Sequence, residues 1–110
     1  MSSLSTHVLD TVSGLPAVGV TFRLYSAQDV LFEGVTNSDG RCPLLRDISL
    51  SAGTYRLEFE IGAYFRGTHT ALEEPSFLDI VPIVFGLAEG RHVHVPLLAA
   101  PYGYSTYRGS

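Results

Sequence analysis

Hydrophobic and polar residues alternate along several short stretches of this chain, which is the pattern of half-buried β-strands. In the clearest stretch, 53–61, Tyr55, Leu57, Phe59 and Ile61 fall on one face and charged residues fall on the other. Alternation or β-favouring composition also predicts strands elsewhere. The further ranges are 4–11, 18–25, 30–36, 77–87, 91–97 and 104–107.

Turn signals separate these stretches. Ser13-Gly14-Leu15-Pro16 indicates a turn, and Asn37-Ser38-Asp39-Gly40 indicates a tight one because Asp-Gly readily supplies positive φ angles. The second turn delivers Arg41 to the start of a short strand that Pro43 limits. Residues 62–67 (GAYFRG) fit one or two helical turns, and 68–76 read as a polar loop.

The order of elements predicts an all-β fold. Seven or eight short strands with turn signals between them, and one brief helix, indicate a β-sandwich. Pro82 stands inside the strand expected at 77–87, which is apolar on both faces. Because proline in sheets is confined to edges or bulges, this should be an edge strand. The chain has no lysine to protect such an edge, so we expect self-association.

Composition narrows the classes of protein. The 110 residues suit one domain, 1–110, and the 45% hydrophobic content suggests that another subunit covers part of the surface. A net charge of −4 gives no attraction for nucleic acid or an anionic membrane. Cys42 is the only cysteine, and we find neither a signal peptide nor a membrane-spanning apolar run. We therefore expect a soluble, cytoplasmic protein.

Histidines provide the most informative candidate chemistry. In the segment 91–110 (RHVHVPLLAAPYGYSTYRGS), His92 and His94 share the polar face of a strand, about 7 Å apart. This spacing suits zinc ligands, and it also suits a general acid–base pair. His7 is a third candidate on the first strand. Each histidine taken alone is more often an ordinary surface or interface residue.

Two other side chains could assist such a site. Arg41 follows a tight turn and could clamp a carbonyl or an anion, although a solvated arginine at a strand end is the commoner case. Ser110, with its carboxylate, could hydrogen-bond a ligand or belong to a disordered end. No glycine-rich phosphate loop, nucleophile elbow or pair of carboxylates is evident.

Several motifs together resemble the 5-hydroxyisourate hydrolases, the transthyretin-related proteins. The ending Tyr107-Arg108-Gly109-Ser110 after HVHVPLL is the most specific of them, because it separates these hydrolases from transthyretin, the thyroid-hormone carrier. Further matches are LSTHVLD at 4–10, TNSDGR at 36–41, and residues 55–65. The resemblance therefore covers the whole chain in order.

The resemblance implies a transthyretin-like, eight-stranded β-sandwich with one short helix, assembled as a homotetramer that is a dimer of dimers. It implies hydrolysis of 5-hydroxyisourate to 2-oxo-4-hydroxy-4-carboxy-5-ureidoimidazoline in urate catabolism, in sites where two dimers meet, with no cofactor or metal. By resemblance, the catalytic residues are His7, Arg41 and His94. The substrate-binding residues are His92, Tyr107, Arg108, Gly109 and Ser110.

Two other functions remain open on the sequence alone. A zinc hydrolase could use His7, His92 and His94 as three metal ligands. A small-ligand carrier like transthyretin would bind without catalysis, but it would leave the histidines and Arg41 unexplained.

Overall fold

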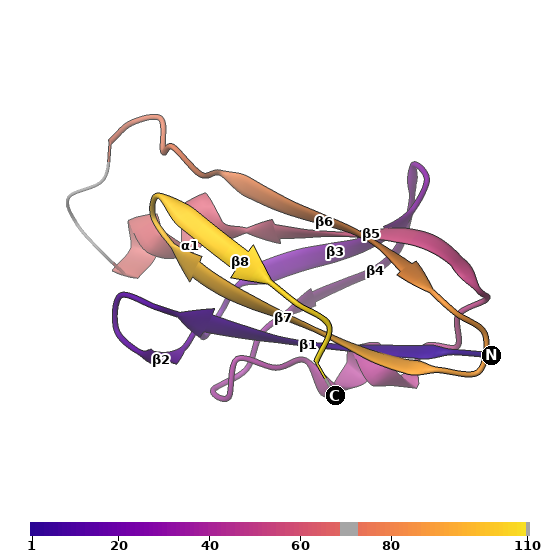
Figure 1. The fold of residues 1–110 in the computed structure, drawn as a ribbon. Helices are drawn as coiled ribbons and strands as arrows, with labels where there is room; N and C mark the ends of the chain where they lie inside the picture. Colours follow the sequence, from indigo (N-terminus) through magenta and orange to yellow (C-terminus); the bar gives the residue numbers. More distant parts are fainter. Residues whose placement is uncertain (69–72, 110) are drawn as a thin grey trace.

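Two four-stranded sheets face each other across a shared core in the computed structural model, which describes residues 1–68 and 73–109 (Figure 1). The strand order is β2-β1-β7-β8 in one sheet and β4-β3-β5-β6 in the other. The strands are β1 (Ser3–Asp10), β2 (Leu15–Pro16), β3 (Thr21–Ser26), β4 (Asp29–Val35), β5 (Gly53–Glu60), β6 (Ile80–Leu87), β7 (His92–Ala100) and β8 (Gly103–Thr106). The helices are a 3-10 helix, η1 (Pro43–Asp47), and α1 (Ile61–Thr68).

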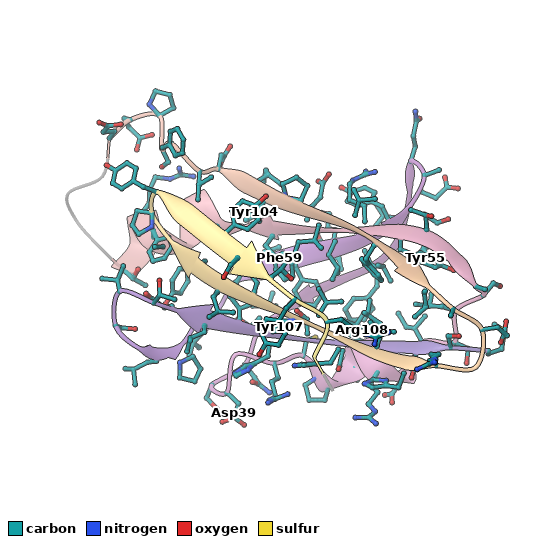
Figure 2. All side chains as sticks on the ribbon, viewed as in Figure 1. Asp39, Tyr55, Phe59, Tyr104, Tyr107 and Arg108 are labelled. Carbon is teal, nitrogen blue, oxygen red and sulfur yellow. The ribbon has the colours of Figure 1, made fainter. Side chains whose placement is uncertain are left out.

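The core follows from the alternation in the sequence. Every second residue of β1 is buried, beginning with Leu4, and on β5 the buried residues are Tyr55, Leu57 and Phe59. The ring centroids of Phe22 on β3 and Phe59 on β5 lie 5.7 Å apart, and Figure 2 shows where Phe59 lies in the sandwich. Full burial of one such side chain contributes roughly 1.5–3 kcal/mol, so this stripe of apolar residues dominates the packing.

The predicted architecture is confirmed. Over the described residues, the structure has eight strands in two sheets and one short α-helix. Strand β6 is an edge strand, as Pro82 predicted, since its only neighbour in the sheet is β5. No helix among the described residues has the length and apolar character needed to cross a membrane.

Some local predictions were wrong. No strand follows Arg41, which forms only an isolated bridge; Pro43 instead opens the 3-10 helix η1, since its fixed φ suits a first helical turn. The expected turn at 13–16 ends in strand β2, which pairs with the end of β1. The expected polar loop at 68–76 is described only in part, because 69–72 lie outside the described residues.

The expected strand at 18–25 also begins later, at Thr21. Gly19 has a φ of +82°, which interrupts extended backbone, and Val18 is exposed rather than part of the core. The regular alternation of Val18 with the following residues therefore did not mark the start of the strand.

Pairing between distant strands positions the polar residues of interest. Strands β1 and β7 run parallel as neighbours along their full length, from Ser3 opposite His92 to Asp10 opposite Ala99. Buried Thr6 ties the strands further, because its hydroxyl donates to the carbonyl of Val95 at 2.7 Å. The two ends of the sequence therefore lie side by side in one sheet (Figure 1).

Candidate active site

The outer face of the β1–β7 pair carries imidazoles and hydroxyls. The register places Ser3 opposite His92 and Ser5 opposite His94. His7 lies two residues beyond Ser5 on the same face of β1. Val93 and Val95, which alternate with the histidines of β7, face the core, so the polar groups stay together on the opposite face.

A tight turn brings Arg41 to this face. The side chain of Asn37 accepts hydrogen bonds from the backbone N–H groups of Asp39 and Arg41, at 2.9 and 3.1 Å. Gly40 has a φ of +73°, and a Cβ there would lie 2.5 Å from the carbonyl oxygen of Val8. Glycine allows the turn to approach β1 so closely that Val8 N–H donates to the Gly40 carbonyl at 2.8 Å.

This contact aligns Arg41 with the first strand. Arg41 and His7 form an isolated antiparallel bridge, although 34 positions separate them in the sequence (41 − 7). The side chain of Arg41 is exposed and lines a groove over the sheet.

The segment that follows β8 also packs against this face of the sheet, beside His94. Gly109 forms an isolated bridge with His94, and its N–H donates to the His94 carbonyl at 2.8 Å. A Cβ on Gly109 would lie 2.7 Å from Cδ2 of His94, so glycine permits this close packing against the imidazole. The position of the His94 ring is thereby limited on one side.

These elements enclose an open groove of about 370 Å³. A volume of this order is typical of sites for small molecules. The groove is lined by Ser5, Arg41, Arg46, His92 and His94. The described residues that line it supply two guanidinium groups and no carboxylate, so they favour a ligand with carbonyl or anionic oxygens.

The electrostatic surroundings keep the two imidazoles of β7 neutral. Burial is the largest cause that lowers the pKa of His94, followed by the positive charge of Arg41 and then by His7 and His92. The pKa of His92 is lowered by burial and by the charge of Arg46. A neutral imidazole can accept a proton, which is what a general base must do.

Hydrogen bonds connect these imidazoles to serines of β1. The Ser5 hydroxyl lies 2.8 Å from Nδ1 of His94 and 3.0 Å from Nε2 of His92. The Ser3 hydroxyl lies 2.7 Å from Nδ1 of His92. In the described part of the chain, Nε2 of His94 has no hydrogen-bond partner, so it is available to a ligand or a water.

The sequence-predicted residues do not all gather at this groove. His92, His94 and Arg41 line it, His7 lies beside it, and Gly109 packs against His94. Ser110 lies outside the described residues. Tyr107 and Arg108 instead line a second groove, which runs between the edge strands β6 and β8 (Figure 2).

Sequence reasoning missed Ser5 and Arg46. The alternation of the first strand put Ser5 on the face of His7, but only the parallel register with β7 shows that it meets His94. Arg46 carried no signal, because it enters the groove from the 3-10 helix η1, which the sequence pattern did not predict.

A three-ligand metal site finds no support within one copy of the chain. Among residues 1–68 and 73–109, no three histidine, cysteine, aspartate or glutamate side chains are placed to hold a metal ion together. Serine hydroxyls, which are not zinc ligands of the usual kind, occupy the hydrogen-bonding positions between the histidines of β7.

Comparisons with known proteins identify the family of the chain. The model of the HIUase/Transthyretin family matches residues 4–109. A 5-hydroxyisourate hydrolase of Mesorhizobium japonicum is 56% identical over 113 residues, which cover 97% of this chain and 91% of that protein.

Solved structures show the same fold. The structure of Klebsiella pneumoniae 5-hydroxyisourate hydrolase has a TM-score of 0.87 and 42% identity, over 100% of this chain and 94% of that chain. Sea bream transthyretin in complex with thyroxine has a TM-score of 0.83 and 30% identity, over 96% and 93%. The transthyretin-like sandwich expected from the sequence is therefore confirmed.

Proposed function

The chain belongs to the HIUase/Transthyretin family, and we propose that it is a 5-hydroxyisourate hydrolase whose reaction takes place in the groove over β1 and β7. The observation that carries this proposal is that His7, Arg41 and His94 meet on one sheet face from three distant parts of the sequence. Relatives named 5-hydroxyisourate hydrolase support the choice of substrate.

The histidines activate water in this proposal. His7 and His94 hold a water molecule, and a neutral imidazole removes a proton from it as the oxygen attacks a ring carbonyl carbon of the substrate. The lowered pKa of His94 supports this role, since it keeps the ring in its neutral form. His92 lines the groove beside His94 on the same strand, so the edge or face of its ring contacts the substrate.

Arg41 stabilises the negative oxygen that develops on the attacked carbonyl. Its guanidinium lines the groove with His94, and preorganised donors of this kind are worth roughly 3–4 kcal/mol of transition-state stabilisation. The ring C–N bond then breaks, the protonated imidazole returns its proton to the leaving nitrogen, and the attacked carbon becomes a carboxylate. The balance requires one water and no cofactor.

We further place the complete site in a homotetramer. Tyr107 and Arg108 point to this, because they lie along the apolar groove between two exposed sheet edges rather than in the histidine groove. Pairing of those edges with other copies would bring Tyr107 and Arg108 of one chain toward the site of another, while Gly109 stays against His94 of its own chain. The tetrapeptide then contributes to substrate binding, with Ser110 positioning substrate or water.

The direct test is loss of the near-ultraviolet absorbance of 5-hydroxyisourate, generated from urate by urate oxidase, with and without this protein. We expect catalytic loss of the absorbance, proportional to protein concentration. A decay rate equal to that of the protein-free sample would contradict the proposal.

The same assay separates the two alternatives. A zinc hydrolase would lose activity after treatment with a chelator such as EDTA and regain it with zinc, whereas we expect unchanged turnover. A carrier would bind the substrate saturably without increasing its rate of decay.

A further inference from the structure

We propose that Ser5 is a positioning residue for His94: its hydroxyl accepts a hydrogen bond from Nδ1–H of His94 and donates one to Nε2 of His92, which leaves Nε2 of His94 unprotonated. The inference rests on the proposed function, in which His94 accepts a proton. It also assigns distinct roles to the two histidines of β7, since His92 orients Ser5 while His94 faces the chemistry.

The distances define a continuous hydrogen-bonded chain. It runs from His94 Nδ1 to Ser5 Oγ at 2.8 Å, from Ser5 Oγ to His92 Nε2 at 3.0 Å, and from His92 Nδ1 to Ser3 Oγ at 2.7 Å. The parallel register of β1 and β7 produces it, because each serine lies opposite one histidine. Each contact is within normal hydrogen-bond distance.

Donor counting leaves two directions for this chain. A serine hydroxyl has one hydrogen to donate, and a neutral imidazole has one N–H and one bare nitrogen. Ser5 has one hydrogen to donate and two lone pairs with which to accept, so at least one of the two histidines donates to it; if both donate, Nε2 of His94 is bare, as it is in the first direction below. In the first direction Nδ1 of His94 is protonated and Nε2 is bare; in the second direction every donor and acceptor is exchanged.

Proton uptake by His94 distinguishes the two directions. An imidazolium has N–H groups on both nitrogens, so Nδ1 must then donate to Ser5. In the first direction, Nε2 takes up the proton and no hydrogen bond changes. In the second direction, Nδ1 is the bare atom, so proton uptake there would require the Ser5 hydroxyl to turn away and give up the hydrogen bond that it donates. The first direction is therefore the one that allows His94 to act as a general base without rearrangement of its hydrogen bonds.

The charges around these hydrogen-bonded side chains favour a neutral His92, which can accept a hydrogen bond from Ser5. Four groups act on these imidazoles: Arg46 from η1 acts on His92, and Arg41 from the turn before η1, His7 from β1 and His92 act on His94. Arg46 lowers the pKa of His92, and Arg41 lowers the pKa of His94. The positive charge of the arginine beside each imidazole disfavours protonation of that imidazole before substrate arrives.

The test is the tautomer of His94, read from ¹⁵N shifts of histidine-labelled protein at a pH of about 8, without substrate. Single His→Gln variants assign the four histidines. We expect a protonated Nδ1 and a bare Nε2 for His94 in the wild type, a shift toward the opposite tautomer in Ser5→Ala, and restoration in Ser5→Thr, whose side chain keeps the hydroxyl. A bare Nδ1 in the wild type, or an unchanged tautomer in Ser5→Ala, overturns the inference.

Kinetics give an independent readout. We expect kcat of Ser5→Ala to fall about tenfold or more, as for other residues that orient a reactive imidazole, with KM within about twofold and recovery in Ser5→Thr. Ser26→Ala, on β3 of the other sheet, is the matched control and should match wild type. Unchanged kcat in Ser5→Ala overturns the inference.

Absence of turnover in the wild type would defeat the proposed function, while the tautomer measurement would still decide the direction of the hydrogen-bonded chain.

Discussion

His94 shows how a single residue acquires reactivity from its surroundings. Burial and the charge of Arg41 both disfavour its protonated form, and His7 and His92 act in the same direction. The pKa of this imidazole therefore lies below the ordinary value of 6.5, and the ring stays neutral further into the acidic range.

We expect Arg41→Ala to raise the pKa of His94, because the largest nearby positive charge that lowers it is removed. The measurement is a titration of the His94 ring by NMR in the wild type and the variant. Arg66→Ala, on α1, is the control, since Arg66 is not among the groups that act on His94. An unchanged or lower pKa in Arg41→Ala would contradict this electrostatic picture.

The same shift affects stability. As pH falls below about 6.5, the imidazoles of the unfolded chain take up protons before those of His92 and His94 in the folded chain, because both folded pKa values are lowered. These two residues therefore make the protein less stable as pH falls from about 6.5 through their lower folded pKa values. Urea unfolding at several pH values measures this loss.

At the scale of elements, two glycines decide how loops meet the β1–β7 pair. Gly40 brings the turn of Arg41 against β1, and Gly109 brings the segment after β8 against His94. Neither position has room for a Cβ: the nearest atom would be 2.5 Å away at Gly40 and 2.7 Å away at Gly109.

We expect Gly109→Ala to lower kcat/KM by about 10-fold to 10²-fold, because the new methyl group displaces the His94 ring and misplacement by about 1 Å can cost this much. Steady-state kinetics on 5-hydroxyisourate measure the loss. Gly103→Ala on β8 is the matched control, since nothing lies within 4 Å of a Cβ there. Equal activities of the two variants would contradict the role of this contact.

Gly40→Ala should destabilise the fold more than Gly90→Ala. Both glycines have positive φ angles, +73° and +71°, and alanine in such a conformation costs roughly 1–2 kcal/mol. Only Gly40 also meets a backbone atom, the Val8 carbonyl, so we expect an additional cost of about 1–3 kcal/mol. Urea unfolding of both variants measures the difference, and equal losses would show that the close approach to β1 is unimportant.

The periodicity of the sequence was enough to predict most elements but not their partners. Alternation found β1, β5 and β7 because each buries one face, and Pro82 marked β6 as an edge. Pairing between β1 and β7 joins residues some 90 positions apart, which no local pattern reports. Ser5 and Arg46 were missed for this reason, because their positions depend on tertiary contacts.

At the scale of the whole molecule, the two sheets leave one pair of edges exposed on the same side. Strands β6 and β8 are these edges, and an apolar groove runs between them. Val84 on β6 is 67% exposed and Tyr104 on β8 is 44% exposed. Unpaired strand edges with apolar side chains are sites of association, which supports the proposed assembly.

We expect sedimentation equilibrium to give the mass of four chains at micromolar concentration. We also expect specific activity to fall on dilution below the range in which the tetramer persists, because in the proposed assembly Tyr107 and Arg108 of one chain contribute to the site of another. A monomer with full specific activity would contradict the assembly, while leaving the groove over β1 and β7 as the site.

The central claim is that a guanidinium from the 36–41 turn stabilises charge that develops beside histidines from the two ends of the chain. The most direct measurement is kcat/KM of Arg41→Ala on 5-hydroxyisourate, together with its melting temperature. We predict a loss of about 10²-fold to 10³-fold in kcat/KM with a melting temperature close to that of the wild type, because the side chain is exposed. Near wild-type turnover by a folded Arg41→Ala variant would contradict the account.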